Sequence, residues 1–447
     1  MRLYLLARTV SWIGSSITLV ALPILLYQRT GSAALSGLLT ALEAIPYLLF
    51  GLPAGALADR WDRRRTLTLT SWTSAALIAS VPAASALEVL TTAHLFLVAG
   101  ATATAFVFFD AAAFGALPAL VGREGVARAT STLMTAGTLV TLIGPAVAGV
   151  LVAAVGAPAA MGADALSYAV AAVLLARLAL PPTVRPGRAR EEPRDPSGRT
   201  DGDPGDPSER AAKEPRDPSG RAAGDQRDPS GRVSGDLRGE IREGVRFIRS
   251  HRLIGSLTFL GVGNSLAEGA VIGLLVVVAV EQFGLPVQDA RIGLLFAAAA
   301  VGAMAAGLAV PWLRRRVPTP VISLVALTAV GLLLLAWAFT GHFPLGLVVL
   351  ALWQGANTLV SLNGIVERQE QTPDHLQGRV NTTARMIAWG GQPAGAALAG
   401  VLADLTSPRA ALVTVAVTVL LTLTLPPART LLGLARRTGV TRAGSGP

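Results

Sequence analysis

The same short charged turn occurs twice in this chain, at a constant shift of 251 positions (302 − 51). The first copy spans Gly51–Arg65 and the second Gly302–Arg316, and each ends in three arginines. Both copies follow a long apolar run, and another apolar run follows each of them. Identities at this shift include Gly51/Gly302, Leu57/Leu308 and Trp61/Trp312, with Arg63 to Arg65 matching Arg314 to Arg316. The sequence therefore predicts two related halves joined end to end.

A second pair of segments, 128–160 and 379–411, agrees on the same shift. Two separate segments that share one offset are hard to obtain by chance in a chain that is merely rich in alanine. Repeated halves that rock about a site between them are typical of secondary transporters. The identities in this pair include Arg128/Arg379, Gly144/Gly395, Gly149/Gly400, Val150/Val401 and Leu151/Leu402.

The composition predicts an all-α polytopic membrane protein. The chain has 447 residues, of which 52% are hydrophobic and 15% charged, whereas a soluble domain carries about 25% charged residues. The apolar runs are about 20 residues or longer, enough to cross a ~30 Å hydrocarbon layer as helices. We predict twelve spans, near 3–28, 32–57, 66–87, 92–120, 129–155, 158–180, 252–281, 288–312, 318–340, 344–367, 380–403 and 408–428.

Several function classes are excluded by residue usage. Cysteine is absent and Lys213 is the single lysine, so neither thiol chemistry nor a Gly-Lys-Ser/Thr phosphate loop is available. None of the four histidines lies in a His-Glu-x-x-His pattern. We therefore expect a protein that is not an enzyme and that binds no cofactor or metal. The first apolar run starts at Leu3 and continues as a full span, so we expect it to remain in the mature protein.

The net charge of +10 reflects membrane topology rather than nucleic-acid binding. Arginines cluster in short loops that alternate along the chain, as the positive-inside rule requires. They follow the second and eighth spans and recur in the tail, whereas the turns after the third and fifth spans are poor in arginine. Both termini are thus expected in the cytoplasm. We predict an N-terminal six-helix bundle (1–180), a linker (181–250), a C-terminal six-helix bundle (251–430) and a cytoplasmic tail (431–447).

The linker between the halves contains a short repeat. The sequence Arg194–Arg199, RDPSGR, recurs with variations every eleven residues up to Arg232. Such a segment, rich in Pro, Gly and mixed charge, cannot bury enough apolar surface to offset its ordering entropy. We predict a disordered cytoplasmic linker, with a docking or phosphorylation tract as the alternative. Residues 236–250 are amphipathic and predict a helix on the membrane surface.

Three motifs resemble the major facilitator superfamily. The turn Gly55-Ala-Leu-Ala-Asp59-Arg60-x-x-Arg63-Arg64 is similar to its signature between the second and third helices. In the fifth span, Gly144-Pro145-x-x-Ala148-Gly149 partly matches the antiporter motif of that superfamily. The stretch from Thr372 to Gly390 resembles the branch that includes enterobactin-exporter and macrolide-efflux proteins. The resemblance implies two six-helix bundles, alternating access and proton-driven export. That branch usually has an acid in its first helix where this chain reads Ile13-Gly14-Ser15-Ser16, so coupling is expected to use other acids.

The first charged turn is a candidate latch between the halves. Asp59 ends a span, with Arg60, Arg63 and Arg64 close by. A carboxylate there can accept charge-assisted bonds from a guanidinium and from a helix N-terminus. The alternative is a solvated loop that only sets orientation. In the second copy Val310 replaces the acid, so that turn is expected to serve orientation rather than latching.

Ionisable residues within the spans are candidates for proton coupling. Each costs roughly 2.5 to 3.5 kcal/mol on insertion scales, so the few that occur are expected to have a function. Glu43 and Glu268 fall near the middle of their spans, one in each half, and Asp110 in the cytoplasmic half of its span. The alternative is a structural acid bonded to a neighbouring helix, and we prefer that interpretation for Asp164, which falls nearer a span end.

Other polar or aromatic residues in the spans are candidates for contact with substrate, namely Asn264, Asn357, Arg385, Trp389 and Gln392. The alternatives are hydrogen bonding between helices for the amides and a lipid-facing or core position for the tryptophan. Arg385 has two further interpretations, an anchor for an anionic group or a partner of Asp110.

The sequence predicts a secondary active transporter, by resemblance a proton-coupled exporter of amphipathic small molecules such as drugs or secreted metabolites. Its expected partners are that substrate, protons and the lipid bilayer, without nucleic acid, and it is expected as a monomer in a bacterial plasma membrane. Two alternatives stay open: an importer of a small metabolite on the same fold, and a membrane scaffold or sensor that does not transport.

Overall fold

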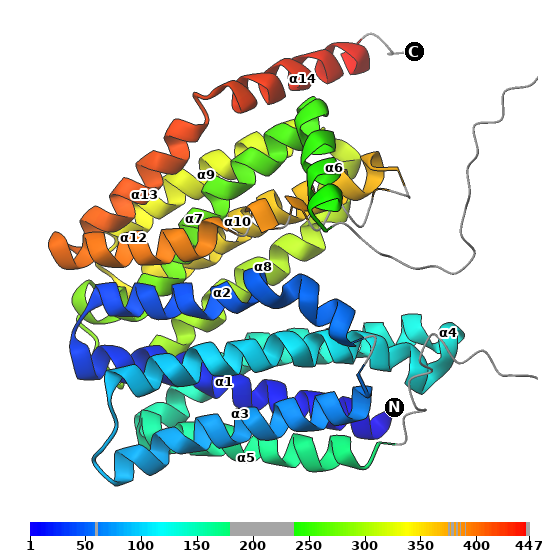
Figure 1. The fold of residues 1–447 in the computed structure, drawn as a ribbon. Helices are drawn as coiled ribbons and strands as arrows, with labels where there is room; N and C mark the ends of the chain where they lie inside the picture. Colours follow the sequence, from blue (N-terminus) through cyan, green and yellow to red (C-terminus); the bar gives the residue numbers. More distant parts are fainter. Residues whose placement is uncertain are drawn as a thin grey trace, which may run out of the picture.

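The computed structural model is a bundle of long helices arranged as two halves (Figure 1). It describes residues 1–58, 61–178, 237–373, 376, 380, 383–384, 386–388 and 390–443. The first half contains α1 (Arg2–Thr30), α2 (Ala33–Ala58), α3 (Arg63–Ala86), α4 (Thr92–Val155) and α5 (Ala157–Ala176). The second contains α6 (Leu237–Ser250), α7 (Arg252–Glu281), α8 (Arg291–Arg316), α9 (Thr319–Phe339), α10 (Phe343–Gln371), α12 (Gly391–Leu405), α13 (Pro408–Thr422) and α14 (Pro426–Ala443).

Within the described residues, ten helices are long and apolar enough to cross a membrane. The number rises to eleven if α13 and α14, which meet at 55°, form one bent span. Two predicted spans, 92–120 and 129–155, lie in α4, whose two arms meet at Gly122 with a φ of 69°. The predicted span 380–403 falls partly outside the described residues, and α12, its described part, has 15 residues. The two arms of α4 are already counted separately among the ten, so α12 and the α13–α14 pair account for the difference from twelve spans.

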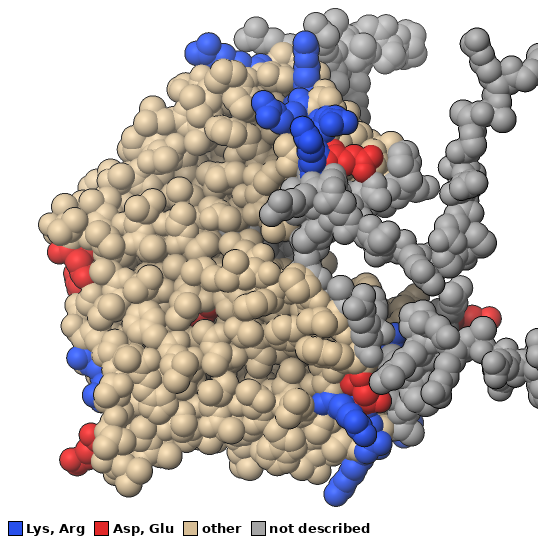
Figure 2. Space-filling view, in the orientation of Figure 1, with Lys and Arg blue, Asp and Glu red and all other residues tan. Residues whose placement is uncertain are grey.

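Charged side chains gather at the two ends of the molecule, and the flank between them is almost uncharged (Figure 2). Exposed residues within the helices include large apolar ones, for example Leu166 in α5 and Val325 in α9, which are 66% and 64% exposed. An apolar band between two charged rims is the surface that a bilayer requires.

Local sequence signals begin and end these helices. Asp62 caps α3 by accepting a hydrogen bond from the backbone N–H of Arg65 at 2.7 Å, and Ser407 caps α13 in the same way. α1 ends at Gly31, whose φ of 60° lies in the left-handed region that glycine adopts without a steric penalty. The tight α1–α2 turn that follows places the two helices antiparallel.

The molecule has two ends, which we name by what lies there. Met1, the α2–α3 junction, the break in α4 and α6 lie at the terminal face, on the right of Figure 1. The α1–α2 and α7–α8 turns lie at the opposite face. Every span connects one face to the other, so a residue's depth follows from its position along its helix.

The halves are joined by helix pairs, α2 with α12 and α7, and α4 with α8. The α4–α8 contact is backbone against backbone at Gly149 and Gly293. A Cβ at Gly149 would lie 2.6 Å from the carbonyl oxygen of Ala290 and 2.9 Å from the Cα of Gly293. Only glycine allows so close an approach, so the repeated small residues of these spans pack the two halves together.

Hydrogen bonds reinforce the junction at the opposite face. The Tyr27 hydroxyl on α1 donates to Glu281 at the end of α7 at 2.7 Å. The carboxylate of Asp404 on α12 accepts from the Ser32 hydroxyl and the Ala33 backbone N–H, both at 2.6 Å. Asp404 thus caps the N-terminus of α2 from the other half of the molecule.

The segment predicted as a disordered linker lies mostly outside the described residues, which resume at Leu237. The amphipathic stretch that follows is helical, as predicted, and forms α6. The stretch 431–443, predicted as part of a tail, is also helical and belongs to α14.

Candidate functional site

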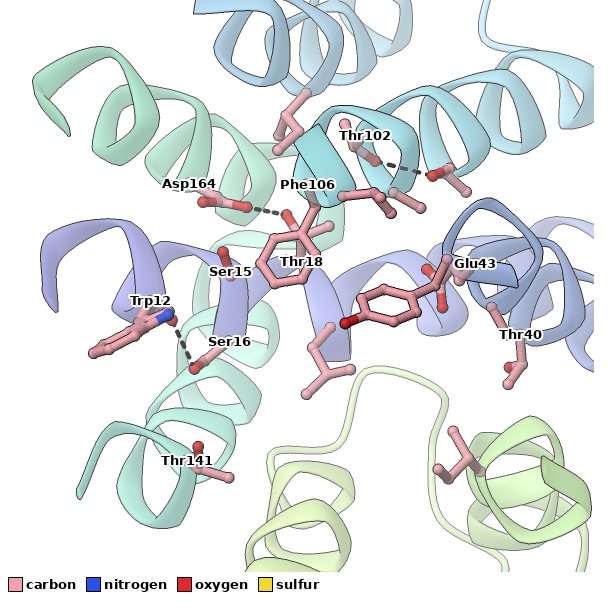
Figure 3. Close-up of a pocket in the computed structure, with 18 of the residues that line it drawn as sticks. Trp12, Ser15, Ser16, Thr18, Thr40, Glu43, Thr102, Phe106, Thr141 and Asp164 are labelled. Atoms are coloured by element: carbon pink, nitrogen blue, oxygen red, sulfur yellow. Dashed lines mark hydrogen bonds between the residues drawn. The ribbon is translucent and has the colours of Figure 1, made fainter. Parts of the chain in front are cut away.

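A cavity of about 760 Å³ lies between the halves, and side chains of α1, α2, α4 and α5 form most of its wall (Figure 3). Ile272 on α7 and Gln392 on α12 contribute from the second half. Glu43 and Gln392, both predicted as site residues, therefore line one cavity. Its size suits a small organic molecule, since ligand pockets usually measure about 300–1,000 Å³.

Glu43 is the acid of α2 that faces this cavity (Figure 3). Its side chain is half-buried, and among the described residues its carboxyl group has no hydrogen-bond or ion-pair partner. A carboxyl group at this depth that the protein does not neutralise is costly and is a candidate for function. Its position fits the prediction of an acid within the membrane, and its role stays a prediction.

Asp164 on α5 is a second acid of the same cavity. It is fully buried, with 0% exposure, and accepts hydrogen bonds from the hydroxyls of Thr18 and Ser167, the latter at 3.1 Å. The neighbouring Tyr168 hydroxyl pairs with that of Ser15 at 2.9 Å. The sequence predicts a structural acid near interfacial water at this position, whereas the structure places Asp164 against the cavity. Because two hydroxyls hold its orientation, Asp164 can present a fixed carboxyl edge.

Aromatic side chains supply much of the apolar wall. Trp12, Tyr47 and Phe106 line the cavity together with Tyr168, and in Figure 3 the ring of Phe106 lies between the Asp164–Thr18 pair and Glu43. The guanidinium of Arg8 lies 4.6 Å from the ring centre of Trp12. The lining thus combines flat apolar surfaces with a few carboxyl and hydroxyl groups, a combination that suits an amphipathic molecule.

The other two predicted acids lie away from the lining of this cavity. Glu268 on α7 is half-buried and hydrogen-bonds Gln354 of α10. Asp110 is half-buried on the first arm of α4, in the half of the span nearer the terminal face. Neither is among the residues that line the cavity with Glu43.

The antiporter-type motif lies where α4 meets both α1 and α8. A Cβ at Gly144 would clash with the Ser16 side chain of α1, and Gly149 contacts α8 as described above. Pro145 lines the cavity between them. The motif therefore joins the cavity wall to the contact between the halves.

The two predicted asparagines face each other between α7 and α10. Each donates its side-chain amide to the other's backbone carbonyl at 3.2 Å, Asn264 to Asn357 and the reverse. Both are 1% exposed. This reciprocal pair is the helix–helix interaction that the sequence analysis kept as an alternative to substrate contact.

Of the predicted latch, Asp59 and Arg60 lie outside the described residues, as do Arg385 and Trp389 of the predicted cavity set. Gly55 belongs to the last turns of α2. Arg63 packs against α4, since a Cβ at Gly115 would lie 3.0 Å from its Nε. Arg64 donates a hydrogen bond to the backbone carbonyl of Ala176 at the end of α5. These two arginines thus connect the start of α3 to α4 and α5.

The second charged turn has acidic partners that the sequence analysis did not identify. Arg314, the counterpart of Arg63, forms ion pairs with Glu367 at 3.2 Å and Glu370 at 2.5 Å. It also donates to the side chain of Asn363 at 2.8 Å. Val310 occupies the place of Asp59 in this copy of the turn. The acids that pair with Arg314 come from α10. The cluster joins the end of α8 to α10.

Comparison with known proteins identifies the class. Residues 4–392 match the model of the Major Facilitator Superfamily, so the chain belongs to that family of membrane transporters and is not an enzyme. The enterobactin exporter EntS of Citrobacter koseri is 28% identical over 91% of this chain and 86% of the relative. The multidrug efflux pump Tap of Mycolicibacterium fortuitum is 25% identical over 90% and 88%.

Solved structures agree on the fold. A crystal structure of a mutant of the nucleoside transporter NupG matches with a TM-score of 0.69 over 94% of this chain and 98% of that chain, at 13% identity. A bacterial homologue of the lysosomal transporter Spinster gives a TM-score of 0.65 over 96% of each chain, at 15% identity. The predicted fold, an all-helical polytopic membrane protein of the major facilitator type, is confirmed.

Proposed function

We propose that this transporter is a proton-coupled exporter, an antiporter of amphipathic small molecules that works by alternating access. Two relatives at 25–28% identity are named as exporters, one of enterobactin and one of multiple drugs. The cavity between the halves has the size and the mixed apolar and polar wall that such substrates need.

The observation that carries the proposal is the pair of carboxyl groups, Glu43 and Asp164, on one cavity wall. A carboxyl group out of water favours its neutral form, and hydration restores its charge. When the cavity alternates between dry and wet states, each acid can therefore take up a proton on one side and release it on the other. Because substrate and proton compete for the same cavity, outward movement of the substrate is coupled to inward movement of a proton.

The position of the contacts supports a direction of loading. The hydrogen bonds of Tyr27 and Asp404 close the halves at the opposite face. We infer that the cavity loads from the terminal face, and we place that face, with both termini, on the cytoplasmic side of a bacterial plasma membrane. A substrate loaded there and released after rocking is exported.

The driving force is adequate for accumulation. Moving one charge through 100 mV yields about 2.3 kcal/mol. At one-to-one exchange this supports a substrate gradient of roughly fiftyfold.

The test is efflux of a fluorescent amphipathic dye from reconstituted vesicles under an imposed pH step. We expect Glu43→Gln and Asp164→Asn each to lower pH-driven accumulation about tenfold or more, because the neutral amide cannot release a proton. Dye exchange without a pH step should persist. Glu88→Gln is the matched control, since Glu88 is an exposed acid in the α3–α4 turn.

Glu268→Gln extends the same test to the second half of the molecule. If Glu43→Gln, Asp164→Asn and the double variant all keep wild-type pH-driven export, the coupling proposal is wrong and Glu268 becomes the next candidate. Net uptake of dye against its gradient would favour an importer. Absence of any flux would favour a scaffold or sensor.

A further inference from the structure

A second pocket, of about 320 Å³, lies where α6, α7 and the start of α14 meet. It is separate from the central cavity and shares no lining residue with it. Its wall consists of Arg249 from α6, of Arg252, Gly255 and Ser256 from α7, and of Pro426, Pro427 and Thr430 from α14. The proposed transport cycle assigns it no role.

The pocket is positively charged and its charge is uncompensated. Arg249 and Arg252 are exposed, and within the described part of the chain neither has a hydrogen-bond or ion-pair partner. Some arginines elsewhere are paired: Arg29 donates to a backbone carbonyl at 2.7 Å, and Arg314 has two carboxylates. No acid is among the residues that line the pocket. Two unpaired guanidiniums at one opening favour an anionic ligand, above all a phosphate.

A buried hydroxyl in the same wall also lacks a partner. Ser256 is 6% exposed, yet its Oγ makes no hydrogen bond to any described residue. Because this hydroxyl lines the pocket, it is free to donate a hydrogen bond to a ligand oxygen there. Ser256 lies in the first turns of α7, where backbone N–H groups and the helix dipole add to the attraction for an anion.

The close packing of α6 on α7 builds this pocket. A Cβ at Gly255 would lie 2.7 Å from the carbonyl oxygen of Ile248, so only glycine lets the two helices approach here. Ile248 is itself 5% exposed and packs with Ile254. The contact fixes Arg249 and Arg252 on either side of the α6–α7 corner. The charged pair is thus positioned by packing.

The surroundings of the pocket match the surface of a membrane. Arg242, Arg246 and Arg249 are exposed along α6, and Figure 2 shows the blue side chains gathered at this end of the molecule. Pro426 and Pro427 give the pocket an apolar wall. A basic rim beside an apolar wall suits the phosphate and glycerol of a phospholipid better than a fully hydrated ion.

We propose that this pocket binds the phosphate of an anionic phospholipid headgroup, held by Arg249, Arg252 and Ser256. The bound lipid would tie α6 to the start of α14. A soluble phosphate shares the same chemistry, and the experiment separates the two sources.

The experiment measures the thermal stability of the purified full-length chain in a neutral detergent. Dioleoyl phosphatidylglycerol, dioleoyl phosphatidylcholine and sodium phosphate are titrated in separate arms, because a ligand that binds the folded state raises Tm by an amount that grows with the ratio of its concentration to its Kd. We expect phosphatidylglycerol to raise Tm at low concentration, and neither phosphatidylcholine nor phosphate to do so. Arg249→Gln with Arg252→Gln should weaken this effect about thirtyfold, on the order of fivefold for each arginine.

Two further variants keep the test informative. Arg242→Gln with Arg246→Gln removes the same charge from the same helix outside the pocket and should retain most of the effect. Ser256→Ala keeps both charges and should still weaken the effect severalfold. If both double variants lost the phosphatidylglycerol effect equally, the attraction would come from the overall charge of α6, and the proposed site would be wrong. The absence of any response of the wild-type protein to phosphatidylglycerol would also overturn the proposal. An equal response to free phosphate would keep the anion site and reject the lipid.

Discussion

Arg314 donates hydrogen bonds to side chains of both α9 and α10, although its sequence motif predicts only a topological signal. Its acceptors are Thr319, Asn363, Glu367 and Glu370. Its side chain is 15% exposed and that of Glu367 8%. Removing one partner of such a pair leaves a poorly solvated charge behind. The cluster therefore stabilises the second half regardless of how the chain is oriented in the membrane.

We predict that Arg314→Gln lowers the free energy of unfolding by about 2–3 kcal/mol, less than a fully buried pair would lose because Glu370 is exposed. Arg315→Gln is the control, since Arg315 is exposed and has no partner among the described residues. Thermal unfolding followed by tryptophan fluorescence should separate the two by several degrees. Equal Tm values for both variants would contradict a structural role for the cluster.

The partners of Arg314 also show where sequence reasoning stops. The shift of 251 positions matches Arg314 with Arg63 because it compares residues at equivalent places. It cannot show that Arg314 pairs with two acids of α10, Glu367 and Glu370. Asp164 is a similar case. Its distance from the end of its span can be predicted from the sequence, but the direction in which its side chain points depends on how α5 packs on α1. Glu43 could be identified as a candidate from the sequence because an acid in the middle of a span is unusual, whichever way its side chain points.

At the scale of elements, the predicted spans agree with the observed helices because hydropathy and turn residues are local properties. The α1–α2 turn and the start of α3 coincide with Gly31 and Asp62. The joining of α4 across Gly122 was not predictable, because it depends on whether a short polar stretch continues the helical geometry. Which helices meet between the halves also depends on tertiary packing that no single segment contains.

The start of α8 offers a pH-dependent test at this scale. Asp289 accepts hydrogen bonds from the side chain and backbone N–H of Arg291, at 2.7–3.1 Å. The side-chain hydrogen bond from Arg291 is the main cause that lowers the pKa of Asp289. The next residue, Ala290, supplies the carbonyl that contacts Gly149. This ion pair therefore organises the helix end at which α4 and α8 join the halves.

A carboxyl group whose pKa is lowered by folding stabilises the native state above its unfolded pKa of about 3.9. That stabilisation is lost as the pH falls through the lower folded value. We predict that Asp289→Asn costs about 0.5–1 kcal/mol at pH 7, as for an ion pair at the protein surface, and that the difference from wild type shrinks as the pH falls below the unfolded pKa of about 3.9. Arg291→Gln should remove most of this pH dependence. A difference that stays constant between pH 7 and pH 3.5 would rule out the ion pair as its source.

At the scale of the whole molecule, the two halves are held at one face by few polar contacts. Asp404 on α12 caps α2 across the junction, and Tyr27 reaches Glu281 beside it. Alternating access requires these contacts to break whenever the opposite face opens. A ligand or substitution can shift such an equilibrium only by its differential effect on the two states. Asp404 makes its contacts across the junction, so its removal acts on the closed state.

The proposed cycle therefore makes a prediction about Asp404. Asp404→Asn keeps the shape of the side chain but weakens a charge-assisted cap, which is worth about 1–2 kcal/mol. The population with the opposite face open should rise about five- to thirtyfold relative to the closed one. Because the chain contains no cysteine, spin labels can be placed at will. Ala159→Cys in α5 and Gly341→Cys in the α9–α10 turn report the opposite face, and both positions are exposed.

Distances between the two labels, measured by pulsed electron paramagnetic resonance in nanodiscs, should gain a longer component in Asp404→Asn. A second label pair at Glu124 and Arg315, exposed residues of the terminal face, should gain a shorter component in the same variant. Glu88→Gln, which removes an exposed acid of the opposite face, should change neither distribution. The reciprocal change at the two faces distinguishes rocking of whole halves from local fraying of α2, which would leave both distributions unchanged because no label lies on α2. Unchanged distributions at both faces would mean that the cap of α2 belongs to the fold and not to the transport cycle.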